Sequence, residues 1–404
     1  MRVCVIGTGY IGLPTALMIA AHGNHVEAVA HRIETANKLR QGQVTFKEEG
    51  LPELFAEATS SGNINFRCDV PAEDFYIITV PTPYLPETKK VDASHIIDAL
   101  RTVLSVSNDN AIVVIESTIS PGTIDKFIRP VILESGKHIR LAHAPERIIP
   151  GNMVNELVYN SRTIGCDDIE TGTIIKSIYG SFCKGDIEIT DIKTAEMTKV
   201  VENTFRDVNI AFANELAKIC RAGGMDVNEI IRISNKHPRV NILSPGPGVG
   251  GHCIAIDPWF LVGDFPEETR IIRTAREINS SMPEYVLNRI LNIMDENGIE
   301  DLSKIGLYGL TYKEDVDDTR ESPTLQLLEV IKEKSLPMPL VYDPMIEKNV
   351  VETQSNSFED FVNKSELIVI MVGHSHIKEN MNVLSDKCVL DTRNVCFNSG
   401  VYRL

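Results

Sequence analysis

The sequence predicts an α/β fold with two Rossmann-like, doubly wound domains joined by a central helical domain that contains a long spine helix. Three observations predict it. Short runs rich in Val and Ile alternate with helical patterns in the first half of the chain, and a glycine-rich turn follows the first run. A long amphipathic pattern then separates these runs from a second, shorter set near the C-terminus. Nearly continuous apolar runs are typical of parallel strands that are buried on both faces.

The expected strands come in two groups, which predicts two separate sheets. Helical patterns lie between the strands of the first group, as in the βαβ units of a doubly wound sheet. The expected strands are 2–7, 25–30, 75–80, 111–118 and 139–146 for the first sheet and 304–313, 339–344, 366–373 and 388–395 for the second.

The spine helix is expected over 194–221, and Gly223 and Gly224 end it. Its two sides differ in chemistry. Apolar residues fall within about 80° of one another at 100° per residue, and polar residues fall opposite them. The apolar set is Val201, Phe205, Val208, Phe212, Leu216 and Ile219, and the polar set is Lys199, Asn203, Arg206 and Asn214.

Composition excludes several classes of protein. The 404 residues have a formal net charge of −16, which argues against nucleic acid as a partner. No apolar run reaches the roughly 18 residues that a membrane helix needs, so we expect no membrane partner and a cytoplasmic protein. The eight cysteines form no CxxC pair, and neither His252 with Cys253 nor His374 with His376 has the spacing of a zinc site, so we expect no metal.

A G-x-G-x-x-G fingerprint follows the first strand and opens a helical pattern. In this motif Gly7 allows a tight turn, Gly9 lets a pyrophosphate approach the backbone, and Gly12 lets helix and strand pack closely. The pattern predicts a dinucleotide site. The second strand ends in Ala30, followed by His31 and Arg32, where NAD-binding proteins place an acid that holds the ribose. The fingerprint makes NAD the expected cofactor, and a small residue followed by two basic ones, which would suit a 2′-phosphate, makes NADP the alternative.

The stretch "GVGGHCIAIDP" places Cys253 on a glycine-rich bend, with Asp257 four residues later. A cysteine is often a small buried hydrophobe. A cysteine on such a bend, with a carboxylate close by, is also a candidate nucleophile. Its ordinary pKa of about 8.5 means that a nearby cation or helix N-terminus would be needed to activate it.

Long motifs over nearly the whole chain resemble those of the UDP-glucose/GDP-mannose dehydrogenase family. They are "GTGYIGLPTA", "VPTP", "ESTISPGT", "APERIIPG", "TAEMTKVVENTFRDVNIAFANE", "HPRVNILSPGPGVGGHCIAIDPWFL" and "GLTYKEDVDDTRESP". The resemblance implies three domains: 1–190 for the dinucleotide, 191–300 for helical dimerisation, and 301–404 for the uridine diphosphate. It implies a four-electron oxidation of the sugar C6 alcohol to a carboxylate, with two cofactors reduced.

The resemblance also implies roles for four residues in the middle of the chain. Cys253 would be the nucleophile of a thiohemiacetal and thioester. Lys199 and Asn203 would stabilise the developing oxyanion, and their spacing of four independently places them on one helix face. Asp257 would orient or activate water, or balance the charge of Lys199.

Two further catalytic candidates lie at the ends of expected strands of the first sheet. Thr118 and Glu146 match positions that hold the water for thioester hydrolysis, and Glu146 is the first choice of base. Some family members have a second acid four residues later, where this chain has Pro150.

Binding residues are carried over from the same motifs. Arg206 is a candidate substrate contact, although simple solvation also explains it. His252 would recognise an N-acetyl group of the sugar, or would only pack against the Cys253 thiol and adjust its pKa. The cofactor set is Gly7, Gly9, Tyr10, Ile11, Gly12, His31, Arg32, Pro81, Thr82 and Thr118, and the substrate set is Arg147, Lys199, Asn203, Arg206, Arg239, Asn241, Gly250, His252, Lys313 and Arg320.

The expected partners are a UDP-sugar and a second copy of the chain, in a homodimer or higher homo-oligomer. The favoured sugar is UDP-N-acetyl-D-mannosamine, and UDP-N-acetylglucosamine and UDP-glucose are the alternatives. A non-catalytic nucleotide-sugar sensor is the alternative from another class, and the absence of an acid at Ala30 is its only support.

Overall fold

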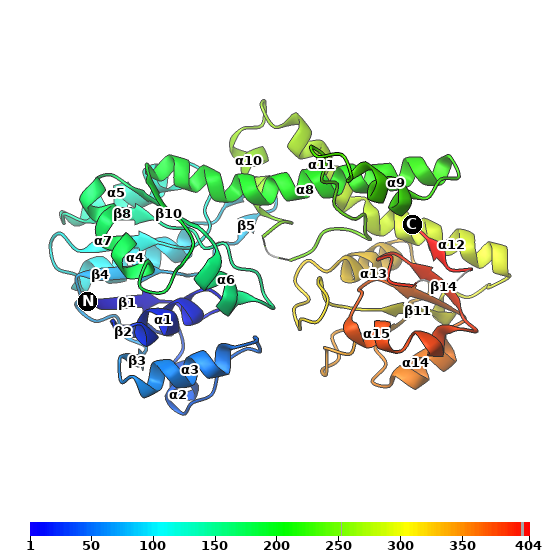
Figure 1. Cartoon of the computed structure of the whole chain (residues 1–404), viewed down its shortest axis with the longest axis horizontal. Coiled ribbons are helices and arrows are strands. Elements are labelled where there is room, and N and C mark those ends of the chain that lie inside the picture. Colours follow the sequence, from blue (N-terminus) through cyan, green and yellow to red (C-terminus); the bar gives the residue numbers. More distant parts are fainter. Residues whose placement is uncertain (252, 397–399) are drawn as a thin grey trace. The chain divides into compact units, whose positions relative to one another are not determined.

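Two sheets organise the chain, each in its own unit, and both are parallel except for one antiparallel pair in the first (Figure 1). The computed structural model describes residues 1–251, 253–396 and 400–404, so the role predicted for His252 lies outside the described residues. The two units are Met1–Glu202 and Asn203–Leu404. This arrangement confirms the predicted α/β class with a sheet in each half of the chain.

The first sheet has eight strands in the order β10-β9-β8-β7-β4-β1-β2-β3. All neighbouring pairs are parallel except β8 and β9. The five predicted strands are confirmed, and β3, β9 and β10 are additional. The bounds are β1 Arg2–Ile6, β2 His25–Val29, β3 Ile64–Arg67, β4 Phe75–Ile78, β7 Ile112–Ile115, β8 Arg140–His143, β9 Arg162–Cys166 and β10 Ile187–Thr190, with a separate hairpin of β5 Tyr84–Leu85 and β6 Lys90–Val91.

Alternate residues of the central strands enter two apolar cores, one on each face of the sheet. In β1, Val3 and Val5 belong to one core, whereas Cys4 and Ile6 belong to the other. This period of two is why these strands are apolar throughout. The helices of this unit are α1 Gly12–Ala21, α2 Ile33–Arg40, α3 Leu51–Ser60, α4 Ser94–Val106, α5 Arg129–Ser135, α6 Met153–Tyr159 and α7 Ile169–Tyr179, with a π-helical turn at Ile124–Ile128 before α5.

The second sheet is smaller and entirely parallel, in the order β12-β11-β13-β14-β15. It also has a core on each face, with Leu307 and Val369 in one and Tyr308 and Ile370 in the other. The bounds are β11 Ile305–Tyr308, β12 Leu340–Tyr342, β13 Leu367–Ile370, β14 Cys388–Asp391, β15 Tyr402–Arg403, α13 Pro323–Glu333, α14 Phe358–Lys364 and α15 Ser375–Glu379, with 3-10 turns at Leu302–Lys304 and Met381–Leu384.

The predicted spine helix is α8, Ile192–Ala222, which begins in the first unit and ends in the second. The helices that follow it are α9 Val227–Ser234, α10 Asp257–Asp264, α11 Arg270–Ser280 and α12 Met282–Asn297. Among the described residues, no helix is both long and apolar enough to cross a membrane.

Helix α8 buries its polar side and exposes much of its apolar side. Its polar residues Asn203, Asp207 and Asn214 are buried, whereas apolar residues on the other side are exposed. Soluble helices usually bury the apolar side. The exposed fractions are 46% for Val201, 67% for Phe205, 53% for Phe212 and 56% for Ile219.

Candidate active site

The glycine-rich turn between β1 and α1 has the geometry of a dinucleotide site. Gly7 has a φ of +106°, and a Cβ on Gly12 would lie 2.1 Å from the Gly7 carbonyl oxygen, so the fold itself requires both glycines. Gly9 is different, because no described atom lies within 4 Å of a Cβ built on it. The fold gives no reason for glycine there, whereas a pyrophosphate close to the backbone does. The site therefore fits NAD.

The other cofactor candidates follow neighbouring strands at the same edge of the sheet. β7, β4, β1 and β2 are adjacent, and ligands of doubly wound sheets bind at the carboxyl ends of such strands. Thr82 Oγ1 donates to the Thr118 carbonyl at 2.7 Å, which joins the loops after β4 and β7. His31 and Arg32 are exposed after β2, and Pro81 is exposed after β4. The centroid of the Tyr10 ring, beside Ile11 in the turn, lies 4.4 Å from that of the Phe46 ring.

Glu146 lies in a buried ion-pair cluster that the sequence analysis did not predict. It pairs with Arg162 on β9, which also lies 3.5 Å from Glu116. The Arg162 guanidinium stacks over the Tyr179 ring at 4.5 Å. Burial raises the pKa of Glu116, against the opposing charge of Arg162. Arg162 thus fixes the orientation of the Glu146 carboxylate, which also accepts a hydrogen bond from Arg147 N at 2.7 Å.

The Arg147 side chain already makes an ion pair and a hydrogen bond within the first unit. Its guanidinium lies 2.9 Å from Glu202 and donates to Thr163 Oγ1 at 2.8 Å. A substrate contact by Arg147 would therefore compete with these partners.

Cys253 is exposed and lies four residues before Asp257, the first residue of helix α10. Its carbonyl accepts from Asp257 N at 2.9 Å, which closes one turn between the thiol residue and the first residue of α10. Asp257 is buried, and its Oδ2 accepts a 2.6 Å hydrogen bond from Asn203 Nδ2 on α8. Two of the predicted catalytic residues, 54 positions apart, are therefore in direct contact.

The glycines before Cys253 have a packing role. A Cβ on Gly250 would lie 2.5 Å from the Glu321 carbonyl oxygen, and one on Gly251 would lie 2.8 Å from the Tyr312 ring. Gly251 N also donates to the Arg320 carbonyl at 2.9 Å. Close approach of the substrate is therefore not needed to explain these glycines, because the fold itself requires them.

Two asparagines of α8, the buried Asn214 and the half-buried Asn209, hold the loop that leads to Cys253. Asn214 accepts from Gly246 N at 2.9 Å and donates to Asn279 Oδ1 at 2.9 Å. Asn209 accepts from Leu243 N at 2.9 Å and donates to the Asn241 carbonyl at 2.8 Å.

The same buried network continues through α11. Asn279 donates to Asp207 at 2.8 Å, and Arg276 donates to the same oxygen at 2.6 Å. Helical periodicity predicted for Asn214 only a place on the polar side of the helix. Polar residues at helical spacing, Asp207 and Asn214 among them, were the signal for this network.

The remaining candidates differ in exposure. Lys199 is buried in the part of α8 that belongs to the first unit. Arg206, Arg239 and Asn241 are exposed. Exposure of Arg206 agrees with simple solvation.

The basic candidates of the second unit follow β11. Lys313 is half-buried and Arg320 is exposed. The Arg320 Nε lies 3.0 Å from both Asp318 carboxylate oxygens. Within the described residues, no group of three or more His, Cys, Asp and Glu side chains could hold a metal ion.

Comparisons with known proteins agree with this description. Three models of the UDP-glucose/GDP-mannose dehydrogenase family match the chain: the NAD binding domain over residues 1–183, the central domain over 193–281 and the UDP binding domain over 306–398. A UDP-N-acetyl-D-mannosamine dehydrogenase from Methanococcus vannielii is 43% identical over 405 residues, which is 98% of this chain and 93% of that relative.

Two solved structures are similar over the full length. The UDP-N-acetyl-D-mannosamine dehydrogenase from Pyrococcus horikoshii has a TM-score of 0.91 and 37% identity, covering 100% of this chain and 98% of that one. The UDP-N-acetyl-mannosamine dehydrogenase from Staphylococcus aureus has a TM-score of 0.88 and 39% identity, with the same coverage. The fold, the glycine turn and these matches define an oxidoreductase that uses NAD. The chain belongs to the UDP-glucose/GDP-mannose dehydrogenase family.

Proposed function

We propose that this protein oxidises UDP-N-acetyl-D-mannosamine at C6 to UDP-N-acetyl-D-mannosaminuronate, through a thioester on Cys253. The observation that carries the proposal is the contact of Asn203 with Asp257, one turn beyond an exposed cysteine. It links the candidate nucleophile to the helix that carries Lys199. The sugar is inferred from the similar proteins, which are named for it.

The two oxidations make different demands on the protein. Bound NAD supplies the hydride acceptor at both steps. In the first, a base removes the proton of the C6 hydroxyl, and Lys199 and Asn203 stabilise the alkoxide that forms. The product is an aldehyde, which is a poor hydride donor until a nucleophile adds to it.

Cys253 supplies that nucleophile. Its thiolate adds to the aldehyde carbon and forms a thiohemiacetal alkoxide, and loss of the second hydride gives a thioester. Water then attacks the thioester carbon, and the acid and the free thiol are released. Glu146, held as an acceptor by Arg162, is suited to bind this water with Thr118 and to take its proton.

We further propose that cofactor binding, catalysis and UDP binding are divided over three segments. Residues 1–190 bind the dinucleotide, and residues 191–300 carry Lys199 and Cys253. Residues 301–404 bind the UDP moiety, with Lys313 and Arg320 as its basic residues, because cations and guanidinium forks suit a diphosphate.

The exposed apolar side of α8 supports a homodimer. Four large apolar side chains exposed on one helix form a surface that a second copy could bury. A self-complementary contact of this kind is the commonest arrangement in homo-oligomers.

Absorbance at 340 nm tests the function directly. Purified protein is mixed with UDP-N-acetylmannosamine, UDP-N-acetylglucosamine or UDP-glucose, each with NAD and with NADP. Two reduced cofactors per UDP-N-acetylmannosamine are expected. Preference for another sugar would contradict the substrate, and nucleotide-sugar binding without turnover in any combination would favour a sensor.

The nucleophile is tested by Cys253→Ala, with Cys388→Ala on β14 as the matched control. Acid formation should fall at least ~10³-fold in Cys253→Ala, as for the loss of other covalent nucleophiles. The control should retain normal turnover. Normal acid formation by Cys253→Ala would rule out the thioester.

A further inference from the structure

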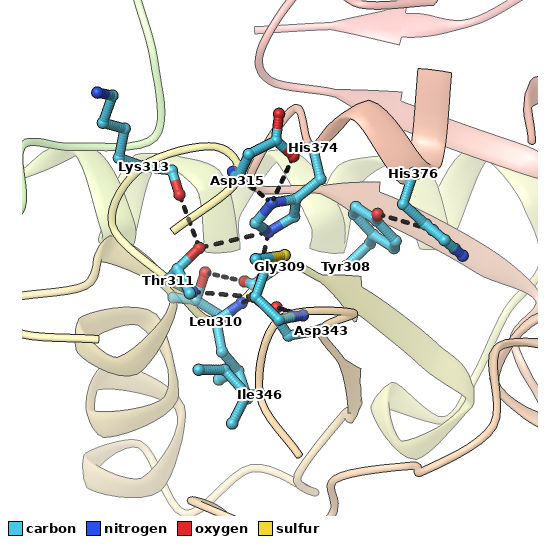
Figure 2. Close-up of polar contacts among 12 residues, drawn as sticks. Tyr308, Gly309, Leu310, Thr311, Lys313, Asp315, Asp343, Ile346, His374 and His376 are labelled. Atoms are coloured by element: carbon cyan, nitrogen blue, oxygen red, sulfur yellow. Dashed lines mark hydrogen bonds and ion pairs between the residues drawn. The ribbon is translucent and has the colours of Figure 1, made fainter. Parts of the chain in front are cut away.

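Three polar residues converge at the carboxyl edge of the second sheet, outside the residues assigned above (Figure 2). Thr311 follows β11, Asp343 follows β12, and His374 follows β13. These three strands are adjacent, and all three side chains are buried. Buried polar groups of this kind need hydrogen-bond partners, so their partners show which segment of the chain the cluster fixes in place.

Asp343 and His374 both bind the backbone of the loop after β11. Asp343 Oδ2 accepts from Leu310 N at 2.5 Å and from Thr311 N at 3.0 Å. His374 Nδ1 accepts from Asp315 N at 2.9 Å. Because Nδ1 is an acceptor, the ring hydrogen lies on Nε2, which is 3.3 Å from Asp343 Oδ2. The histidine thus bridges the two ends of the loop.

A second set of contacts closes the loop from its other end. Ser375 donates through its backbone N at 2.9 Å and its Oγ at 2.6 Å to the Asp315 carboxylate. Thr311 Oγ1 donates to the Lys313 carbonyl at 2.8 Å. Asp315 has a φ of +57°, which costs a non-glycine residue of the order of 1 kcal/mol.

Lys313 lies between these fixed points. The backbone is held at residues 310 and 311 before it, at its own carbonyl, and at residue 315 after it. The Lys313 side chain extends away from the cluster (Figure 2). A flexible lysine loses less conformational entropy on binding a ligand when its backbone is already fixed.

We propose that His374 and Asp343 are positioning residues that fix the 310–315 loop and so orient Lys313 toward the diphosphate of the nucleotide sugar. This inference rests on the proposed function, because it takes Lys313 as a ligand contact. Burial acts to raise the pKa of Asp343, but hydrogen bonds from His374 and from backbone N–H groups outweigh it and lower the pKa. The carboxylate is therefore available as the acceptor that the loop needs.

Calorimetric titration of the full chain with UDP tests the inference through a double-mutant cycle. The proteins are wild type, His374→Asn, Lys313→Ala and the double variant. Each single change should weaken UDP binding about 10-fold, because ordering costs and a charge contact are each of that size. The double variant should bind no more weakly than Lys313→Ala alone, since His374 acts through Lys313.

Two further readouts separate positioning from a general effect on folding. The KM for the UDP-sugar should rise in His374→Asn while kcat and NAD affinity stay within about 2-fold. His376→Asn is the matched control, because its ring contacts Tyr308 and not the loop. If His374→Asn does not fold, Asp315→Ala replaces it, since Asp315 is exposed and its carboxylate holds Ser375.

The outcomes are distinguishable. No UDP binding by the unchanged protein would overturn the proposed function and the inference with it. Intact wild-type binding with additive losses in the double variant would overturn the inference alone. Intact wild-type binding with no loss in Lys313→Ala would overturn the inference and remove Lys313 from the proposed UDP contacts, while leaving the proposed reaction in place.

Discussion

Asn203 on α8 donates a 2.6 Å hydrogen bond to Asp257, the first residue of α10. Both side chains are buried. The bond links the spine helix to the turn that carries Cys253, so a change on the helix is expected to alter the position of this proposed nucleophile. It also fixes the amide of Asn203, which we propose as an oxyanion donor.

Asn203→Ala should therefore reduce kcat by about 10²-fold, as for the loss of one oxyanion donor. It should also lower the free energy of unfolding by about 1–3 kcal/mol, since Asp257 loses a buried partner. Steady-state kinetics and denaturant melts measure the two effects. Asn292→Ala on the exposed side of α12 is the control. An unchanged kcat would remove Asn203 from the proposed mechanism.

Asn214→Ala tests the network that holds the loop before Cys253. Gly246 N and the Asn279 amide would lose their partner in a buried site, at a cost of about 1–3 kcal/mol. Because the loop would then be less well fixed, kcat should fall about 10-fold, a smaller loss than for a group that touches the substrate. The alkylation rate of Cys253 should change with it. An unchanged alkylation rate and kcat would contradict a positioning role.

Much of the fold followed from the sequence because strands buried on both faces are apolar throughout. The strands missed in the first sheet lack that signal. β9 begins with Arg162, a buried cation that makes the segment look like a surface strand. Its partners Glu146 and Glu116 are 16 and 46 positions away, and only the pairing of β8 with β9 brings the former close.

The two faces of α8 show a second limit of prediction from the sequence. Periodicity predicted a helix with two chemically different sides, but it does not say which side is covered. Here the polar side is buried because Asn203, Asp207 and Asn214 find hydrogen-bond partners on α10, α11 and the loop before Cys253. Those partners are 32 to 72 positions away in sequence, beyond the reach of any local pattern.

The basic residues after β2 predict how the cofactor is selected. Arg32 is exposed at the N-cap of α2, where it could bind the 2′-phosphate of NADP. Arg32→Ala should leave kcat/KM for NAD within about 2-fold and lower any activity with NADP about 10-fold, the effect of one lost charge-assisted hydrogen bond. Arg101→Ala, on α4, is the control. A large loss with NAD would mean that Arg32 binds a group common to both cofactors.

His143 predicts a loss of stability in mild acid. Burial lowers the pKa of His143 from 6.5 to about 4, and its Nδ1 donates to the Ile115 carbonyl at 2.8 Å. The unfolded chain binds a proton more readily than the folded one, so this contribution is complete above pH 6.5 and is lost as pH falls toward 4. It amounts to roughly 3 kcal/mol. His143→Asn keeps a donor without the titration, so its stability should fall less over this pH range; a parallel fall would contradict the assignment.

The exposed apolar side of α8 predicts that the proposed dimer depends on Phe205 and Phe212. These two side chains are 67% and 53% exposed in the single chain, and they lie two helical turns apart on one side. A stable dimer needs a desolvated apolar centre, and a carboxylate placed there would be costly to bury. Phe205→Glu with Phe212→Glu should therefore convert a species of twice the chain mass into a monomer at micromolar concentration, as measured by light scattering after gel filtration. Leu133→Glu is the control, because Leu133 is 78% exposed on α5, outside this surface. A wild-type monomer, or a double variant that remains dimeric, would mean that this side of α8 does not form the interface.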